Sequence, residues 1–404
     1  MLFLFEDLVL DPGRRELRRG SEDISLEPQV FDLLLHLIQN RDRVVTRDEL
    51  IASVWQGRIV SESTLASRIN AARNAVGDNG QAQRLIKTIQ RKGVRFVGAV
   101  RERESVSAAA KAGGDTETPA PRHAQDVTFF RTADDVHLAV AASGSGMPVV
   151  KAANWLNHIE YDWQSPIWSP LIGLLSDRFR LIRYDERGNG LSDWNVDDLS
   201  FDAFVRDLET VVDGFDLKRF ALLGISQGAS FSIAYAVRHP ERVSRLVLCG
   251  GYVQGWRRRS SETEIARREA LYTLAQHGWG QDNPAFRQVF TSLFIPGGTP
   301  EQMQWFNDLQ RVSTSPENAV RLFKIFGEID VSEFLPRISV PTLVLHARGD
   351  ARVPFEQGLA LARSIPGARF VALDSDNHVI LSHEPAWHRY IAEITAFLGQ
   401  ANEG

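Results

Sequence analysis

The chain has 404 residues, 43% of them hydrophobic and 24% charged, a composition typical of a globular protein with two or three domains. A single cysteine excludes a disulfide framework, and no apolar run reaches the roughly 18 residues needed to cross a bilayer. We therefore expect a soluble, cytoplasmic protein without a membrane partner. The net charge of −5 hides a positive segment, because positions 58–95 hold eight basic residues against two acidic ones.

The first hundred residues predict three helices and a hairpin. Thr46 and Glu49 have the spacing of a capping box, which marks the start of the second helix. The hairpin has a basic tip, Arg91-Lys92-Gly93. Three helices followed by such a hairpin are typical of a winged helix, whose third helix enters the major groove of DNA. The predicted segments are two short strands, three helices and two hairpin strands over 2–10, 16–18, 27–38, 46–55, 65–76, 84–90 and 94–98.

This region resembles the DNA-binding domain of OmpR/PhoB- and ToxR/CadC-type regulators over about residues 1–100. The resemblance depends on these positions: 31–35, 43–50, Trp55, 69–73, 77–78 and 86–96. One departure is Val94, where the family usually has an aromatic residue. The resemblance implies that the partner is double-stranded DNA and, because such domains usually act in pairs, that the protein is a homodimer.

The same resemblance divides the exposed residues of this domain into two groups. Side chains off the apolar stripe of the third helix would reach base edges: Thr64, Ser67, Arg68, Asn70 and Ala71. Basic residues nearby would contact phosphates, which set affinity and register rather than sequence: Arg73, Lys92 and Arg95. A plain surface role is the alternative for each of these residues.

A flexible linker is predicted over 101–125, where small and polar residues dominate and apolar positions lack a period. It separates a domain over 1–100 from a larger one over 126–400. In the larger domain β-like runs alternate with helical stretches, which favours a mostly parallel sheet covered by helices. The predicted fold class is α/β, preceded by the winged helix. The β-like runs are 127–130, 137–142, 148–153, 179–184, 220–223, 243–248, 342–346 and 370–373.

The most informative motif of the larger domain is Gly224-Ile-Ser-Gln-Gly228, which lies between an apolar run and a helix. A serine with small neighbours at a strand-to-helix turn indicates a nucleophile elbow. Later in the chain, Asp350 follows a buried strand and His378 lies on the loop after the last strand. We therefore expect a triad in which His378 takes the proton of Ser226 and Asp350 orients the imidazole.

The order serine, aspartate, histidine resembles that of the α/β-hydrolase superfamily, over about residues 126–400. Asp374 and Asp376 are alternative partners of His378, but both share its loop, so Asp350 is favoured. A triad of this kind needs no metal or cofactor, and the sequence shows no cluster of metal ligands.

The resemblance also implies an oxyanion hole and a cap. One oxyanion donor would be the backbone N–H of Gln227. The second would come from the loop after the third strand, where Ala153 and Asn154 replace the usual His-Gly and Trp155 would donate. An insertion over about 252–335 is rich in aromatic residues, several at helical spacing. This predicts a helical cap and a small apolar ligand.

Three functions agree with these patterns. The first is a one-component transcriptional regulator whose hydrolase-like domain senses, and hydrolyses, an ester, thioester, lactone or amide. In the second, the triad only binds the ligand, because the oxyanion loop departs from the family pattern. In the third, the protein is a hydrolase whose winged helix serves protein interaction.

Overall fold

A computed structural model of the chain describes residues 2–12, 16–20, 22–24, 26, 28–55, 62–79, 81–89, 92–103, 125–279, 281 and 285–400. The chain divides into two compact units, Met1–Asp115 and Thr116–Gly404. None of the helices in these described ranges combines the length and hydropathy that a membrane crossing requires.

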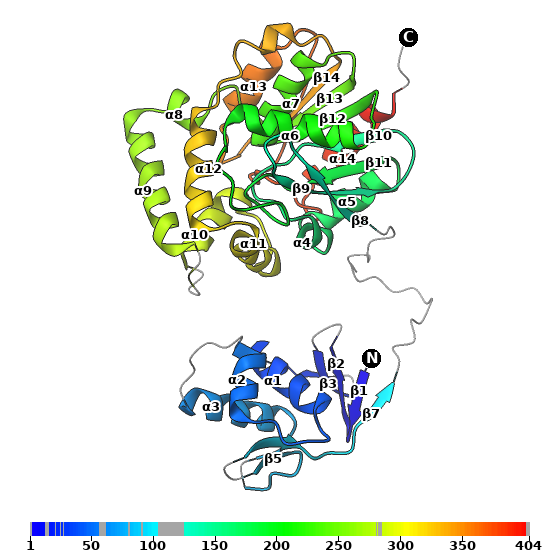
Figure 1. Ribbon diagram of the computed structural model, residues 1–404, viewed down its shortest axis with the longest axis vertical. Helices are drawn as coiled ribbons and strands as arrows, with labels where there is room; N and C mark the ends of the chain where they lie inside the picture. The colour runs from blue at the N-terminus through cyan, green and yellow to red at the C-terminus, as the bar shows by residue number, and fades with distance from the viewer. Residues whose placement is uncertain are drawn as a thin grey trace. The chain divides into compact units, whose positions relative to one another are not determined.

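The smaller unit combines a five-stranded antiparallel sheet, in the order β4-β3-β2-β1-β7, with three helices and a hairpin (Figure 1). Its strands are β1 (Leu2–Phe5), β2 (Leu8–Asp11), β3 (Glu16–Arg19), β4 (Glu22–Ile24), β5 (Ile86–Ile89), β6 (Gly93–Phe96) and β7 (Arg101–Arg103). Its helices are α1 (Pro28–Gln39), α2 (Arg47–Trp55) and α3 (Glu62–Ala75). The predicted helices and the β5–β6 hairpin occur in the predicted order.

Local sequence explains where these helices begin and end. The backbone N–H of Glu49 donates to Thr46 Oγ1 at 3.2 Å, as the capping-box spacing predicts. Gly77, just beyond α3, has a φ of +71°, a conformation that glycine adopts without steric cost. The helices enclose an apolar core with the sheet and hairpin, which includes Leu34, Leu37 and Phe96.

The predicted linker begins too early. Arg101–Arg103 form β7, which pairs antiparallel with β1. This pairing satisfies backbone groups of β1 that would otherwise lie at an open sheet edge. The remainder of the predicted linker up to residue 124 lies outside the described residues.

The larger unit contains an eight-stranded mixed sheet in the order β15-β14-β13-β12-β10-β11-β9-β8. The central strands are parallel, whereas β9 runs antiparallel to both β11 and β8. Every residue of β12 is buried, as expected for a central strand covered on both faces. The strands are β8 (Asp126–Arg131), β9 (His137–Ser143), β10 (Pro148–Lys151), β11 (Arg180–Tyr184), β12 (Phe220–Ile225), β13 (Val243–Cys249), β14 (Thr342–Ala347) and β15 (Arg369–Leu373). Each predicted β-like run therefore corresponds to a strand.

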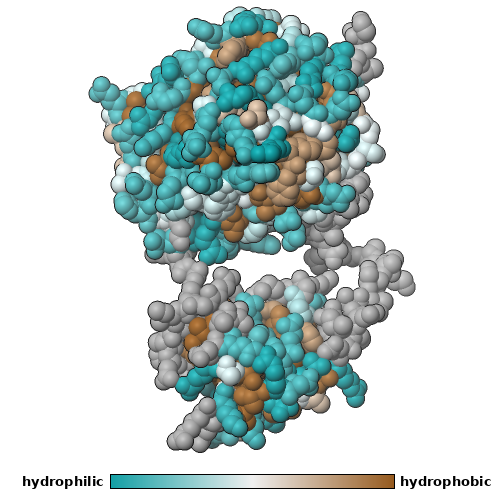
Figure 2. All heavy atoms as spheres, viewed as in Figure 1, coloured by the Kyte–Doolittle hydropathy of each residue, from teal (hydrophilic) through white to brown (hydrophobic). Residues whose placement is uncertain are grey.

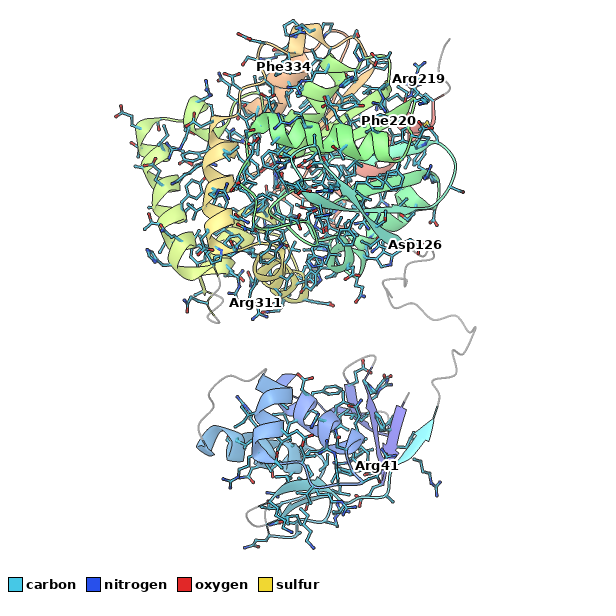
Figure 3. All side chains as sticks on the ribbon, in the orientation of Figure 1. Arg41, Asp126, Arg219, Phe220, Arg311 and Phe334 are labelled. Atoms are coloured by element: carbon cyan, nitrogen blue, oxygen red, sulfur yellow. The ribbon has the colours of Figure 1, made fainter. Side chains whose placement is uncertain are left out.

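Helices pack against this sheet, and α6 and α7 lie side by side on it (Figure 1). Helix α7 contacts β12 and β13, while α14 contacts β14 and β15. The helices outside the cap are α4 (Ile159–Trp163), α5 (Ser169–Ser176), α6 (Phe201–Gly214), α7 (Gln227–Arg238), α13 (Phe355–Ser364) and α14 (Ala386–Gly399). In Figure 3, the labelled Phe220 marks the start of β12, and the predicted nucleophile follows the other end of that strand.

The segment between β13 and β14 forms a cap of helices, which Figure 1 shows beside the sheet. The helices are α8 (Trp256–Arg259), α9 (Glu262–Gly278), α10 (Ala285–Phe294), α11 (Pro300–Ser313) and α12 (Pro316–Glu328), followed by the short η1 (Leu335–Arg337). Aromatic side chains dominate its interior; Phe323, for example, stacks on Tyr272 and Phe290. Figure 2 shows mostly hydrophilic residues over the visible face of the larger unit, as expected when the apolar residues are inside.

Candidate functional site

Ser226 lies at a sharp turn between β12 and α7. Its backbone has φ 55° and ψ −128°, a conformation that non-glycine residues rarely adopt. The flanking glycines allow close approach: a Cβ on Gly228 would lie 2.6 Å from the carbonyl oxygen of Ala153. A Cβ on Gly224 would lie 2.6 Å from Ala229 Cα. The two glycines therefore allow the turn to pack against the loop after β10 and against its own helix.

The predicted acid and base are paired. Asp350 follows β14, His378 follows β15, and Asp350 Oδ2 lies 2.7 Å from His378 Nδ1. Asp350 Oδ1 also accepts hydrogen bonds from the backbone N–H groups of Arg352 at 2.8 Å and Val353 at 2.9 Å. Burial alone would raise the pKa of Asp350, but His378 and the Val353 N–H outweigh it and hold that pKa below its usual value. The carboxylate is thus kept charged to orient the imidazole.

The other ring nitrogen of His378 is unpaired among the described residues. Its Nε2 atom is buried and has no hydrogen-bond partner among the described residues, so the expected bond to Ser226 Oγ is not formed here. Both residues nevertheless border the same backbone: Ser226 N–H donates to the carbonyl of Cys249, and a Cβ on the next residue, Gly250, would lie 3.1 Å from the His378 ring. Catalytic hydrogen bonds are often long before substrate binds.

A second histidine, His346, lies next to Asp350. His346, inside β14, is buried, and its Nε2 lies 2.9 Å from the Val353 carbonyl and 3.5 Å from Asp350 Oδ2. Burial lowers the pKa of His346, which favours the neutral ring. A neutral imidazole next to Asp350 leaves the charge of that carboxylate available to His378.

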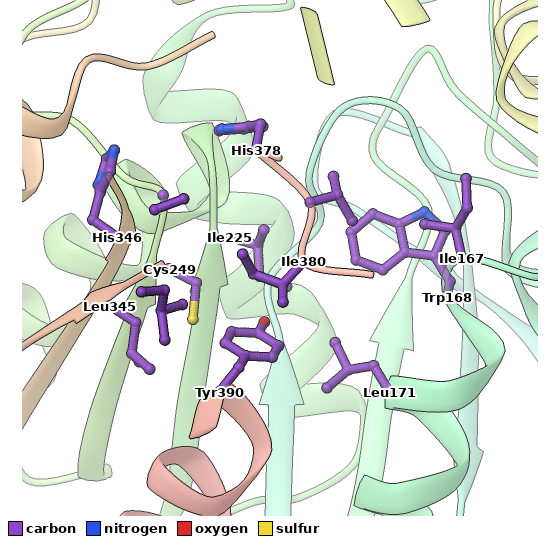
Figure 4. Close-up of a pocket in the computed structure, with 14 residues that line it drawn as sticks. Ile167, Trp168, Leu171, Ile225, Cys249, Leu345, His346, His378, Ile380 and Tyr390 are labelled. Atoms are coloured by element: carbon purple, nitrogen blue, oxygen red, sulfur yellow. The ribbon is translucent and has the colours of Figure 1, made fainter. Parts of the chain in front are cut away.

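An apolar cavity underlies the His378 loop. Figure 4 shows His346 and His378 above a group of apolar and aromatic side chains that includes Ile225, Leu345 and Tyr390. Cys249 belongs to this lining, and burial raises the pKa of its thiol to about 12, so it is not a reactive thiolate at neutral pH. The apolar side chains around this cavity therefore pack beneath His378, and Cys249 does not act as a second nucleophile.

Ser226 opens into a different cavity, beneath the cap. Gln227 and Trp155, the predicted oxyanion donors, line it together with Ser226. The Trp155 ring stacks on Trp279 and contacts Phe323 edge-on, so this residue is fixed by cap aromatics. The cavity measures about 30 Å³, room for one or two water molecules. Its full lining is Trp155, Ser226, Gln227, Tyr252, Trp256, Arg259, Arg268, Phe294, Phe326, Arg352 and Val353.

Three arginines in that lining were not predicted. The sequence predicts an apolar ligand, and the aromatic part of the lining agrees with this. Arg259, Arg268 and Arg352 add strong positive charge to the same cavity. Arg352 could have been considered for the site because it lies two residues after Asp350. Nothing in the sequence shows that Arg259 and Arg268 line the same cavity as Ser226.

Buried charges also support the loop after β10, which carries Trp155. Lys151, the last residue of β10, donates to the side-chain oxygen of Asn154 and lies 5.3 Å from the Trp168 ring centre. Burial lowers the pKa of Lys151 to about 8 and raises that of Asp162, in the same buried group, to about 6. Lys151 thus holds Asn154, which together with Ala153 stands where the family usually has His-Gly.

In the smaller unit, some of the predicted DNA-contacting residues are exposed, and others are hydrogen-bonded within the domain. Ser67 and Asn70 are exposed on α3, and Lys92 is exposed between β5 and β6. Arg68 and Ala71 are half-buried. Thr64 lies in α3, but its side chain is outside the described residues.

Two of the predicted phosphate contacts are bonded within the domain instead. Arg73 is buried; its Nε donates to the Ile86 carbonyl at 3.0 Å and its Nη2 to Thr88 Oγ1 at 2.8 Å. These bonds tie α3 to β5 and argue against the phosphate contact predicted for Arg73. The half-buried Arg95 donates from Nε to the Arg41 carbonyl at 2.9 Å, which fixes the base of its guanidinium.

Two family descriptions match the chain, one in each unit. Residues 20–96 match the family described as transcriptional regulatory protein, C terminal. Residues 160–295 match the family described as alpha/beta hydrolase fold. The second match covers the loop after α4, the elbow and the first part of the cap.

Individual relatives agree with the second match. The AB hydrolase superfamily protein YisY of Bacillus subtilis is 28% identical over 252 residues, which are 62% of this chain and 91% of the relative. The pimeloyl-[acyl-carrier protein] methyl ester esterase of Nitrosomonas europaea is 25% identical over 243 residues, 59% of this chain and 91% of the relative. The solved esterase EaEST from Exiguobacterium antarcticum shares the fold, with a TM-score of 0.57 at 23% identity, over 68% of this chain and 99% of its own. The chain thus joins an OmpR/PhoB-type transcriptional regulatory domain to an α/β-hydrolase domain.

Proposed function

We propose that the protein is a one-component transcriptional regulator whose hydrolase domain binds and cleaves a small ester, thioester, lactone or amide. The observation that carries the proposal is the strained Ser226 at the wall of a capped cavity, with the Asp350–His378 pair at the ends of neighbouring strands. The regulatory domain supports a DNA-binding role. In this proposal the protein acts as a homodimer in the cytoplasm.

The proposed reaction gives each of these groups a role. His378 accepts the proton of Ser226 Oγ on its open Nε2 as the oxygen attacks the carbonyl carbon. Asp350 holds the Nδ1–H and stabilises the imidazolium that forms. The N–H groups of Gln227 and Trp155, both in the cavity lining, would stabilise the oxyanion. His378 then gives the proton to the leaving group as its bond to the carbonyl carbon breaks, which leaves the acyl group on Ser226 Oγ. Water attacks this acyl carbon while His378 takes its proton, and His378 returns that proton to Ser226 Oγ as the acid is released.

The small cavity supports a sensing role. The cavity of about 30 Å³ holds only one or two water molecules, so we propose that the cap moves away from Ser226 when an ester binds. A ligand that binds the opened arrangement better shifts the equilibrium between the two arrangements. This gives the hydrolase domain two states, and the regulatory domain can respond to the difference.

The test compares the wild type with Ser226→Ala in the hydrolysis of p-nitrophenyl butyrate. We expect kcat to fall by at least about 10³-fold, because the nucleophile is lost. Ser230→Ala is the matched control, since Ser230 is a buried serine one turn further along α7. Equal rates for wild type and Ser226→Ala would contradict a catalytic role.

A second function, a sensor without turnover, is favoured by one observation. Ala153 and Asn154 replace the family's His-Gly, and Asn154 is bound by Lys151. In that case the wild type would show no hydrolysis above background. Ser226→Ala would then bind DNA with the same ligand dependence as the wild type.

A further inference from the structure

Arg259, Arg268 and Arg352 come from separate segments and converge on the cavity beside Ser226. Arg259 ends α8, Arg268 lies in α9, and Arg352 follows β14. Arg268 is buried, and the other two are half-buried. Their guanidinium groups are therefore largely removed from bulk water.

The protein neutralises one of these charges. Arg268 Nε donates to Glu264 Oε1 at 2.9 Å. Arg259 and Arg352 form no salt bridge with a carboxylate of the described residues. Arg259 donates to the Gln254 carbonyl and lies 5.3 Å from the Tyr252 ring centre. These contacts orient a guanidinium but leave its charge uncompensated.

Arg352 is held in a similar way. Its guanidinium lies 5.2 Å from the ring centre of Phe294. The nearest acid in sequence, Asp350, is already bonded to His378 and to the backbone of Arg352. Two positive charges thus face a cavity in which the catalytic carboxylate is committed elsewhere.

Electrostatics agrees with this arrangement. Burial, with repulsion from Arg268 and Arg352 as a smaller cause, lowers the pKa of Arg259 to about 10. Burial is also the main reason that the pKa of Arg352 is lowered. Both groups stay charged at neutral pH, so the free protein carries an unfavourable concentration of positive charge that an anion would relieve.

We propose that the ligand carries an anionic group, a carboxylate or a phosphate, which Arg259 and Arg352 bind while the scissile carbonyl lies at Ser226. This rests on the proposed function and names its substrate class. The planar guanidinium fork matches both anions and can bind either through two hydrogen bonds. The aromatic lining, including Phe294 and Phe326, would contact the short apolar spacer between the two ends.

The test measures kcat/KM for three methyl esters of similar length: monomethyl glutarate, methyl 4-phosphonobutanoate and the neutral methyl valerate. We expect the wild type to prefer at least one anionic ester over the neutral ester by about 10- to 100-fold. In Arg259→Met, that preference falls by at least about 10-fold. Whichever anionic ester carries the preference identifies the anion.

Arg348→Met is the matched control, because Arg348 is exposed, lies as close to Asp350 in sequence as Arg352 does, and stacks on Phe355 instead of lining the cavity. It should keep the wild-type preference. If Arg259→Met fails to fold, as shown by its melting curve, Arg352→Met provides the same comparison. A wild-type preference near one, or one unchanged in the folded variant, overturns the proposal.

A binding measurement separates this proposal from the proposed hydrolysis. Glutarate and phosphate are titrated into Ser226→Ala, which cannot turn over, and thermal melting is followed. Stabilisation that disappears in Ser226→Ala/Arg259→Met supports the anion site even when no ester is cleaved. Ester hydrolysis that depends on Ser226, without anion preference or anion binding, leaves the hydrolase intact and overturns the anion site.

Discussion

Two arginine sites in the larger unit balance their charge differently. Arg187, after β11, is fully buried, with its guanidinium 2.6 Å from Asp207 and 2.7 Å from Asp134. Arg259 and Arg352, in the cavity beside Ser226, form no salt bridge with a carboxylate of the described residues. The Arg187 site is complete in the folded chain, whereas the cavity site requires a group from outside. A buried guanidinium can therefore serve the fold or a ligand, and its partners distinguish the two.

Removing each arginine and measuring stability tests the difference between the two sites. Arg187→Met leaves Asp207 buried without its cation and should lower the free energy of unfolding by about 3–5 kcal/mol. Arg259→Met should change it by less than about 1 kcal/mol, and towards higher stability, because it removes repulsion from Arg268 and Arg352. Urea unfolding followed by tryptophan fluorescence measures both. A larger loss from Arg259→Met would reverse the assignment.

Glu186 is a third kind of buried ionisable group. It stays neutral by keeping its proton instead of pairing with a cation. Glu186 is buried, receives a bond from Asn189 Nδ2 at 3.1 Å, and has its pKa raised by burial to about 8 although Gln227 lowers it. Because the folded pKa lies above the unfolded value of about 4.3, the folded state binds the proton more tightly. The resulting stability is complete below about pH 4 and is lost as the pH rises through 8.

Glu186→Gln keeps the shape of the side chain and removes its ionisation. Between pH 6 and 9 the wild type should lose about 1–3 kcal/mol more unfolding free energy than the variant. The difference between the two proteins cancels the contributions of other groups that titrate in the same range. Parallel curves for the two proteins would show that Glu186 is already charged in the folded state.

The residues of the predicted triad could be located from the sequence because each depends on a local pattern. Ser226 directly follows β12, Asp350 lies three residues after β14 and His378 five residues after β15, and parallel strands bring their carboxyl ends to one edge of the sheet. The elbow glycines mark the turn itself, since the backbone of Ser226 needs the space they leave. Sequence therefore predicted the sheet and the position of these three residues at one of its edges.

The arginines could not be predicted because their roles depend on packing between distant segments. Arg259 and Arg268 lie on cap helices among charged neighbours, a pattern that indicates a solvated face. Only the fold of the cap over Ser226 makes them part of the cavity. Arg73 shows the same limit in the smaller unit: its spacing on α3 fits a DNA contact, but the position of β5 buries it.

The smaller unit also has one bonded and one exposed basic residue, and here we expect the smallest effect. Arg73 is bonded inside the domain, whereas Lys92 is exposed between β5 and β6. We expect Lys92→Met to lower the slope of log affinity against log salt by about 1 for a 30-base-pair random duplex, with stability nearly unchanged.

Arg73→Met should leave that slope unchanged and lower the unfolding free energy by about 1–3 kcal/mol, because the Ile86 carbonyl loses its partner. Fluorescence anisotropy in a salt titration measures the slopes. An absence of wild-type binding at any salt concentration would favour a protein-interaction role for the winged helix, and a slope that changes only in Arg73→Met would reassign the phosphate contact.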